Sequence, residues 1–230
     1  MILSHRHRFI FLKTAKTAGT SVEIGLSRFA GPDDIITPIS RDDERLRREC
    51  GGLGPQNYRL PVRPRYLRSL AGSLIKGRWP GYYNHMSGAE VREYAGEKVW
   101  GSYFRFCIER NPFDRVVSLY WWCHRREPRP TIGEFLRSGQ LELLSQRGIA
   151  LYTDSAGRFL VDQVLRYERL EADLEVVRER LGLPEPLVLP RAKSGHRPVQ
   201  QSWREVLSAE DRRLIEQRFG RELELFGYEW

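Results

Sequence analysis

Hydrophobic positions at the start of the chain predict a strand followed by a helix. Residues 9–12 form an unbroken apolar run of strand length. Small and polar residues occupy 13–19, and Gly31-Pro32 closes the segment. Between them, apolar residues recur at helical spacing: Val22, Leu26 and Phe29. The first unit is therefore expected to be strand, loop and helix, with the helix starting at Thr20.

A second unit of the same kind is expected from residue 103. Residues 103–109 alternate apolar and polar positions, which predicts a strand. Asn111 and Pro112 then provide a helix cap and a first helical residue. The apolar face of that helix comprises Phe113, Val116, Val117 and Tyr120. Arg115 and Ser118 lie three apart on the other, polar face, where Arg115 could be a surface salt-bridge partner.

The remainder of the chain continues the alternation. A helix is expected over 132–146 and a short strand over 164–167. An amphipathic helix over 170–181 ends at Gly182, and Ser208 with Asp211 opens a last helix. Strands alternating with helices predict an α/β fold with a parallel sheet, and 230 residues suit a single domain over 1–230.

Residues 40–81 depart from this pattern and are interpreted as a basic, variable insertion. Glycine and proline are scattered through it, with a breaker cluster at 51–55. Two interpretations stay open: a solvated surface excursion, and a lid that faces a substrate. The basic residues of the segment are Arg41, Arg45, Arg47, Arg48, Arg59, Arg63, Arg65, Arg68, Lys76 and Arg78.

The composition of the chain indicates which kind of partner and which cellular compartment to expect. The chain carries 38 basic and 30 acidic residues, a net charge of +8 and a pI near 9.6, which favour anionic partners. Three widely spaced cysteines predict no zinc site and a reducing compartment, with Cys107 in the core. No apolar run reaches the length of a membrane span or a signal peptide, so we expect a cytoplasmic protein.

The loop after the first strand has the composition of an anion site. Backbone N–H groups at a helix start bind anions, and small residues such as Ala18 and Gly19 allow a close approach. Lys16 adds a point charge, and hydroxyl groups come from Thr17, Thr20 and Ser21. The loop lacks the first glycine of a Walker A motif, and no GxGxxG follows a strand. An ordinary strand–helix turn with a surface lysine is the alternative.

The sequence Ala15-Lys-Thr-Ala-Gly-Thr-Ser21 resembles the 5′-phosphosulfate loop of sulfotransferases that use 3′-phosphoadenosine 5′-phosphosulfate (PAPS). The family form is Pro-Lys-Thr-Ala-Gly-Thr-Ser, and Ala15 replaces the proline. The resemblance is closest to the carbohydrate-type branch. It implies a P-loop-NTPase-like three-layer fold, with a central parallel sheet flanked by helices. It also implies transfer of a sulfuryl group from PAPS to an acceptor hydroxyl, with release of adenosine 3′,5′-bisphosphate (PAP) and no metal.

The segment 106–120 resembles the second signature of the same family, in which an arginine and a serine hold the 3′-phosphate. The matching residues are Arg110 and Ser118. Residues 167–174 and 223–228 also resemble family segments. The basic loop 191–197 corresponds to a family segment that folds over the nucleotide, so Lys193 and Arg197 are expected near the 3′-phosphate or the adenosine.

The resemblance places Lys16 at the leaving group and His85 as the base that accepts the proton of the acceptor hydroxyl. Histidine suits that role near neutral pH. His85 follows Tyr82-Tyr-Asn between the two donor signatures, and a loop or cap histidine is the alternative. Glu23 and Glu109 are the fallback bases. Four aromatic residues could stack on a sugar or phenolic acceptor, or belong to the core: Tyr82, Tyr83, Trp121 and Trp122.

Two other functions compete with sulfuryl transfer. A small-molecule kinase would need magnesium carboxylates and a full Walker loop, which the sequence lacks. A non-catalytic nucleic-acid-binding protein would suit the positive charge, but no helix-turn-helix, zinc or aromatic–basic strand signature accompanies it. We therefore expect PAPS and a hydroxyl acceptor, sugar-like or anionic, as the partners, with no nucleic acid and no membrane span.

Overall fold

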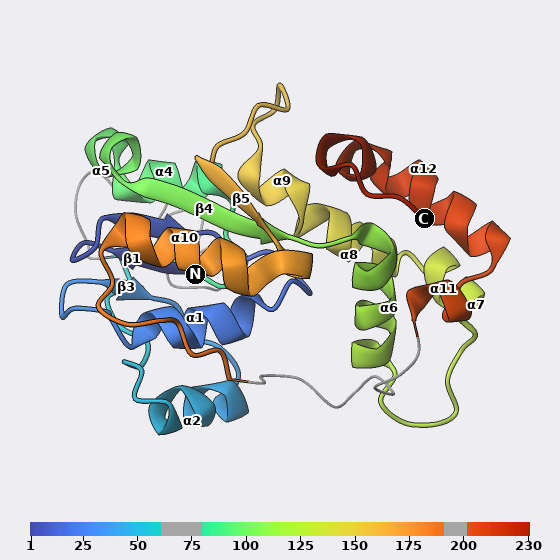
Figure 1. Ribbon diagram of the computed structural model, residues 1–230, viewed down its shortest axis with the longest axis horizontal. Coiled ribbons are helices and arrows are strands. Elements are labelled where there is room, and N and C mark those ends of the chain that lie inside the picture. Colours follow the sequence, from blue (N-terminus) through green and yellow to red (C-terminus); the bar gives the residue numbers. More distant parts are fainter. Residues whose placement is uncertain (61–79, 191–201) are drawn as a thin grey trace.

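The computed structural model describes residues 1–60, 80–190 and 202–230, and its centre is a five-stranded sheet (Figure 1). The strand order is β3-β1-β2-β4-β5. Strands β2, β4 and β5 run parallel, and β1 is antiparallel to both of its neighbours. The strands are β1 (Ile2–Ser4), β2 (Phe9–Phe11), β3 (Ile35–Ile36), β4 (Phe104–Glu109) and β5 (Gln163–Arg166).

The sheet is mixed, which corrects the expectation of a central parallel sheet. The sequence pattern did not predict β1, because its apolar part is too short to stand out beside the charged residues 5–8. These residues form the turn of a hairpin, in which Ser4 pairs with Phe9 and Ile2 with Phe11. Strand β3 then adds to the outer side of β1. The parallel arrangement holds for the three strands that precede the site.

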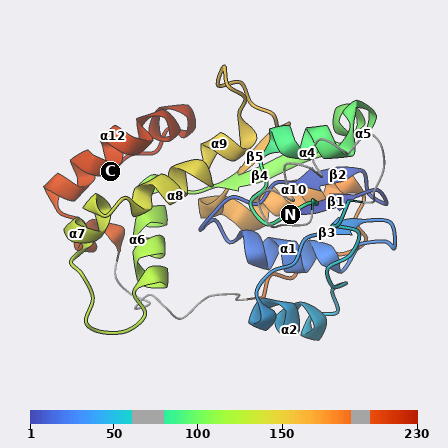
Figure 2. The same ribbon diagram turned by 180° about the vertical axis from the view of Figure 1, so that it is seen from behind.

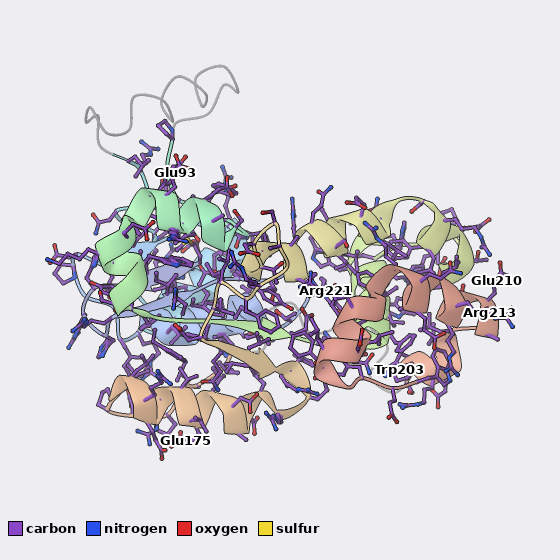
Figure 3. All side chains as sticks on the ribbon, turned by 90° about the horizontal axis from the view of Figure 1, so that it is seen from above. Glu93, Glu175, Trp203, Glu210, Arg213 and Arg221 are labelled. Atoms are coloured by element: carbon purple, nitrogen blue, oxygen red, sulfur yellow. The ribbon has the colours of Figure 1, made fainter. Side chains whose placement is uncertain are left out.

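Helices cover both faces of the sheet. On one face, Phe11, Phe106 and Leu165 pack against α1 (Gly19–Ser27) and α10 (Leu170–Leu181). On the other face, Ile10 and Cys107 pack against α4 (Gly88–Ala95), α5 (Glu97–Ser102) and α9 (Ile149–Tyr152). Successive strand residues point to opposite faces, so both layers have an apolar surface to cover. Figure 3 shows the sheet between the two layers, with Glu93 and Glu175 marking the outer helices. Cys107 is fully buried, as predicted.

A helical cluster lies beyond one end of the strands (Figures 1 and 2). The helix expected over 132–146 is two helices, because Gly139 takes a left-handed conformation with φ of 80°. The last helix begins after a capping box of Ser208 and Asp211, as predicted. The cluster comprises α6 (Pro112–Cys123), α7 (Ile132–Arg137), α8 (Gln140–Gln146), α11 (Trp203–Val206) and α12 (Ala209–Phe226).

The expected insertion begins with a regular helix, α2 (Arg41–Glu49), which the Ser40 hydroxyl caps. Helix α2 packs against α1. Residues 61–79 of the insertion lie outside the described part of the chain, so the interpretation of this segment as a lid stays a prediction. Among the described residues, no helix is both long and apolar enough to cross a membrane.

Candidate functional site

The predicted site residues gather where the three parallel strands end. Parallel strands present their carboxyl ends at one edge of the sheet, and α/β proteins collect ligands there. The segment 12–18 follows β2, Arg110 follows β4 and Tyr167 follows β5. The Leu12 N–H donates to the Phe106 carbonyl, which extends the pairing of β2 and β4 into this edge.

The loop at this edge holds its backbone in an uncommon conformation. Lys16 and Ala18 both have positive φ, 64° and 61°, although neither is glycine. Such residues cost of the order of 1–3 kcal/mol each and cluster at functional sites. Ala18 is the N-cap of α1 and offers no side-chain cap. Within the described ranges, the N–H groups of Thr17, Ala18, Gly19 and Ser21 donate to no protein acceptor. Consecutive undonated N–H groups at a helix start form a site for an anion.

Three carbonyl oxygens of the same loop are bonded to side chains from distant segments. The Lys13 oxygen bonds to His85 Nδ1 at 2.9 Å. The Ala15 oxygen accepts from Arg115 Nε at 2.9 Å, and the Lys16 oxygen accepts from Arg110 at 3.0 Å. Carbonyl oxygens that faced an anion would repel it. Their engagement elsewhere therefore leaves the N–H side of the loop available to negative charge.

His85 is held in one tautomer by this arrangement. A carbonyl oxygen can only accept, so Nδ1 carries the proton and Nε2 keeps its lone pair. Burial, together with the nearby charges of Lys13 and Arg147, lowers the pKa of His85 to about 3. The ring is therefore neutral at ordinary pH. His85 also has a positive φ of 59°, so its backbone is strained as well.

Arg110 is fixed on three sides. Its guanidinium pairs with Asp114 at 2.8 Å, donates to the Lys16 oxygen and lies 3.9 Å from the centre of the Tyr167 ring. Ser118 follows Asp114 by one helical turn of α6, so both lie on the same face. The half-buried Ser118 hydroxyl makes no hydrogen bond with the residues that the structure describes. Arg110, through its pair with Asp114, therefore lies on the same side of α6 as Ser118.

The other predicted donor-site residues take different positions. Lys16 Nζ lies 5.4 Å from the centre of the Trp122 ring. Thr17 is fully buried, and its hydroxyl bonds to that of Thr14 inside the loop. The side chains of Thr20 and Ser21 are also largely buried. Lys193 and Arg197 lie outside the described residues, so their predicted contact with the nucleotide stays a prediction.

Arg115 is not the surface salt-bridge partner that helical spacing suggested. It is 1% exposed, and it bonds to Glu109 at 2.8 Å and to the carbonyl oxygens of Ala15, Leu144 and Arg147. The face of α6 opposite the apolar one is covered by the segment around α8, which spacing along one helix cannot reveal. Arg115 is therefore a structural residue that joins α6, the loop and α8.

Both fallback bases are buried and fully bonded. Glu109 accepts from the Arg110 N–H, Arg115 and Tyr152. Burial alone would raise the pKa of Glu23, but the charges of Lys13, the Met1 amino group and Arg47 outweigh it and lower that pKa to about 2. Neither carboxylate presents an unbonded oxygen to the loop, which leaves His85 as the better candidate.

Four aromatic residues were candidates for stacking on an acceptor ring. Among them, Trp122 is the one that is both exposed and close to Lys16. Tyr82 is buried against Tyr94, and Tyr83 donates to Glu90. Trp122 is 36% exposed and lies beside Lys16. The described part of the chain contains no group of three or more His, Cys, Asp or Glu side chains that could hold a metal ion.

Sequence reasoning missed Lys13, Asp114 and Tyr167 as parts of the site. Asp114 lies in the first turn of α6, and only the structure pairs it with Arg110. Tyr167 is the last residue of the strand predicted over 164–167, and that position was the available signal. The carboxylate of Glu168 accepts from the Asn111 N–H and from the Tyr228 hydroxyl, which ties the C-terminal segment to the Arg110 turn.

Fold and site together define a mixed α/β protein with a candidate anion-binding loop at the carboxyl edge of its parallel strands. The chain belongs to the same family as an uncharacterized protein of Archaeoglobus fulgidus. The two are 34% identical over 101 residues, which cover 42% of this chain and 82% of the archaeal protein. No protein-family model matches the chain, and no solved structure does.

Proposed function

We propose that this chain is a PAPS-dependent sulfotransferase with a P-loop-NTPase-like arrangement around the loop 13–18. One observation carries the proposal. His85 and Arg110 both bond to carbonyl oxygens of that loop, although 72 and 94 residues separate each from its partner. The candidate base, the loop and the candidate 3′-phosphate arginine therefore meet at one place, as a donor with an anion at each end requires.

The geometry supports a division of roles. The undonated N–H groups at the start of α1 would hold the 5′-phosphosulfate, and Arg110 with Ser118 would hold the 3′-phosphate. Lys16 would neutralise charge on the departing 5′-phosphate oxygen. The acceptor oxygen attacks sulfur in line while the bond from sulfur to the 5′-phosphate oxygen breaks. His85 Nε2 takes the proton of the acceptor hydroxyl, and PAP leaves.

The acceptor is proposed to be a sugar, alcohol or phenol hydroxyl. Trp122 supports a ring-shaped acceptor, because its exposed indole lies beside Lys16. The free cysteines Cys50, Cys107 and Cys123 are consistent with action in the cytoplasm.

A ligand-binding test separates this function from its competitors. Thermal unfolding is followed with PAP and with ATP–magnesium, in parallel and at equal concentrations. PAP should raise the melting temperature, since a ligand at 100 times its Kd stabilises a protein by about 2.7 kcal/mol. Stabilisation by ATP–magnesium alone would favour a kinase and contradict the proposal. Salt-sensitive binding to DNA without any response to PAP would favour a nucleic-acid-binding protein.

Turnover is the second part of the test. The protein is incubated without metal, with PAPS carrying labelled sulfur and a panel of sugars, alcohols and phenols. Labelled sulfate ester should form with at least one acceptor class, and the His85→Ala variant should form none. Full activity in His85→Ala would remove His85 as the base.

A further inference from the structure

A buried ion-pair network joins the insertion to the donor loop. Glu23 of α1 stands at its centre, fully buried. Its two oxygens pair with Lys13 Nζ at 2.9 Å and with Arg47 at 3.0 Å. The Met1 amino group lies 3.3 Å from the same carboxylate. Arg47 comes from α2, the first helix of the insertion, and is itself fully buried. Of these residues, only Lys13 also belongs to the loop 13–18 described above.

The network leads directly to His85. The aliphatic part of the Lys13 side chain packs closely against Gly19, at the start of α1. A Cβ atom added at Gly19 would lie only 2.8 Å from Lys13 Cγ. The Lys13 ammonium is held by Glu23, and the Lys13 carbonyl oxygen holds His85 Nδ1. Lys13 therefore connects the two groups: its side chain forms the ion pair with Glu23, and its backbone carbonyl binds His85. A buried ion pair is a stiff connection, since displacing either partner would leave a charge without compensation.

We propose that Arg47 and Glu23 are positioning residues for His85. By holding Lys13 in place, they keep the Lys13 carbonyl oxygen against Nδ1–H, and Nε2 remains the proton acceptor. The insertion is thereby part of the catalytic arrangement through its first helix. The catalytic consequence rests on the proposed sulfotransferase function, but the effect on the state of the His85 ring does not.

The charges around His85 and its hydrogen bond to the Lys13 carbonyl oxygen act on its pKa in opposite directions: the charges lower the pKa and the hydrogen bond raises it. After burial, the Lys13 ammonium is the largest influence that lowers the pKa of His85, and Arg147 and the Met1 amino group add to it. Glu23 pairs with that ammonium at 2.9 Å, which favours its charged form although it is buried. Loosening Arg47 weakens one of the two side-chain ion pairs of Glu23, and the Glu23 carboxylate and Lys13 should then shift in position. Both the tautomer and the pKa of His85 should respond to that shift.

The first measurement uses the unmodified protein. Long-range ¹H–¹⁵N spectra distinguish a histidine protonated at Nδ1 from one protonated at Nε2. His85 should show the Nδ1–H form and no titration near its ordinary pKa. An Nε2–H ring, or a ring that titrates near 6.5, would overturn the proposal.

The second measurement tests the network with variants. In Arg47→Met, the Nδ1–H signal of His85 should weaken, because the Lys13 carbonyl oxygen is held less firmly against the ring. Arg47→Lys restores a cation opposite Glu23 and should restore the signal. Arg105→Met, which removes the exposed ion pair with Asp162, is the matched control and should leave His85 unchanged. A folded Arg47→Met protein with an unaltered His85 ring contradicts the proposal.

Folding of the variant does not limit the test. If Arg47→Met fails to fold, Glu44→Gln loosens Arg47 while its pair with Glu23 remains. A smaller change of the His85 signal in the same direction is then expected, and no change overturns the proposal. These spectra need neither PAPS nor an acceptor. They therefore test the positioning of His85 even if the protein transfers no sulfuryl group. With an active enzyme, Arg47→Met should lower kcat about tenfold or more and leave the Kd for PAP within about twofold.

Discussion

The guanidinium of Arg110 donates to the carbonyl oxygen of Lys16 across 3.0 Å, although the two residues lie 94 positions apart. The turn after β4 and the loop after β2 are therefore joined by a charge-assisted hydrogen bond, and Asp114 and Tyr167 fix the same guanidinium. A nucleotide with a phosphate at each end would meet a site whose two halves are already tied together.

Arg110→Gln should weaken PAP binding about 10- to 100-fold. The change removes both the proposed charged contact to phosphate and the tether to the Lys16 oxygen, and hydrogen bonds to charged groups contribute about 1.5–3 kcal/mol. Calorimetric titration with PAP measures the effect. Arg105→Gln is the control, because Arg105 lies on the strand that precedes Arg110 and forms a partly exposed ion pair with Asp162. An Arg110→Gln protein that binds PAP as the control does would exclude this residue from the 3′-phosphate site.

Lys16→Met should lower kcat by about 10²–10³ and change PAP affinity far less. The ammonium is expected to act on charge that develops only as the sulfur–oxygen bond breaks, which is the pattern of a transition-state contact. Steady-state kinetics with labelled PAPS separates kcat from KM. Equal losses in PAP affinity and in kcat/KM, with kcat unchanged, would assign Lys16 to donor binding instead.

The pH dependence of stability should report the buried His85. Burial and Lys13 lower its pKa from 6.5 to about 3 in the folded protein. Above pH 6.5 the ring is neutral in both states. Between 6.5 and 3 the unfolded chain takes up a proton that the folded chain does not. The free energy of unfolding should therefore fall as the pH drops through this window, by at most about 1.4 kcal/mol per pH unit from this group.

Urea unfolding of the wild-type protein and of His85→Asn, measured over this pH range, isolates the contribution. An asparagine amide can still donate to the Lys13 oxygen but does not titrate. The wild-type curve should lose more stability with acid than the variant curve. Parallel curves would show that the ring is not buried as a neutral group.

Gly19→Ala should destabilise the protein by about 1–3 kcal/mol, as overpacking of a filled site does. The added methyl group would lie 2.8 Å from Lys13 Cγ, and Lys13 is buried and ion-paired, so a shift of its side chain would disturb that pair. Gly101→Ala is the matched control, since a Cβ there meets nothing within 4 Å in helix α5. That control should be neutral or stabilising. Equal stability of the two variants would contradict the close packing at Gly19.

The sequence was sufficient to predict the elements that carry the loop and the Arg110 turn. The strand over 9–12, the strand over 103–109 and the Asn111 cap were each expected, and Asn111 Oδ1 accepts from the Phe113 N–H. These features are local, because apolar runs and capping residues act within a few positions of the chain. The meeting of Lys16, His85 and Arg110 was expected from family resemblance, and local pattern could not have given it.

Features that depend on distant partners escaped prediction. Strand β1 has only three residues and is recognisable only through its pairing with β2 and β3. Arg115 shares a helix face with polar neighbours, but periodicity cannot say whether another element covers that face. The network of Lys13, Glu23 and Arg47 consists of charged residues, which a sequence alone assigns to the surface, and only the fold reveals that they are mutually compensated.

The engagement of Arg47 has a consequence for protein engineering. Helix α2 contributes a guanidinium to the interior, and Gly52 packs tightly against Ser27 of α1, so the start of the insertion is built into the domain. A chimera that exchanges residues 40–81 as one cassette would remove Arg47, one of the counter-charges of Glu23, together with the swapped segment. Libraries that aim at new acceptors should therefore retain residues 40–52 and introduce diversity after them.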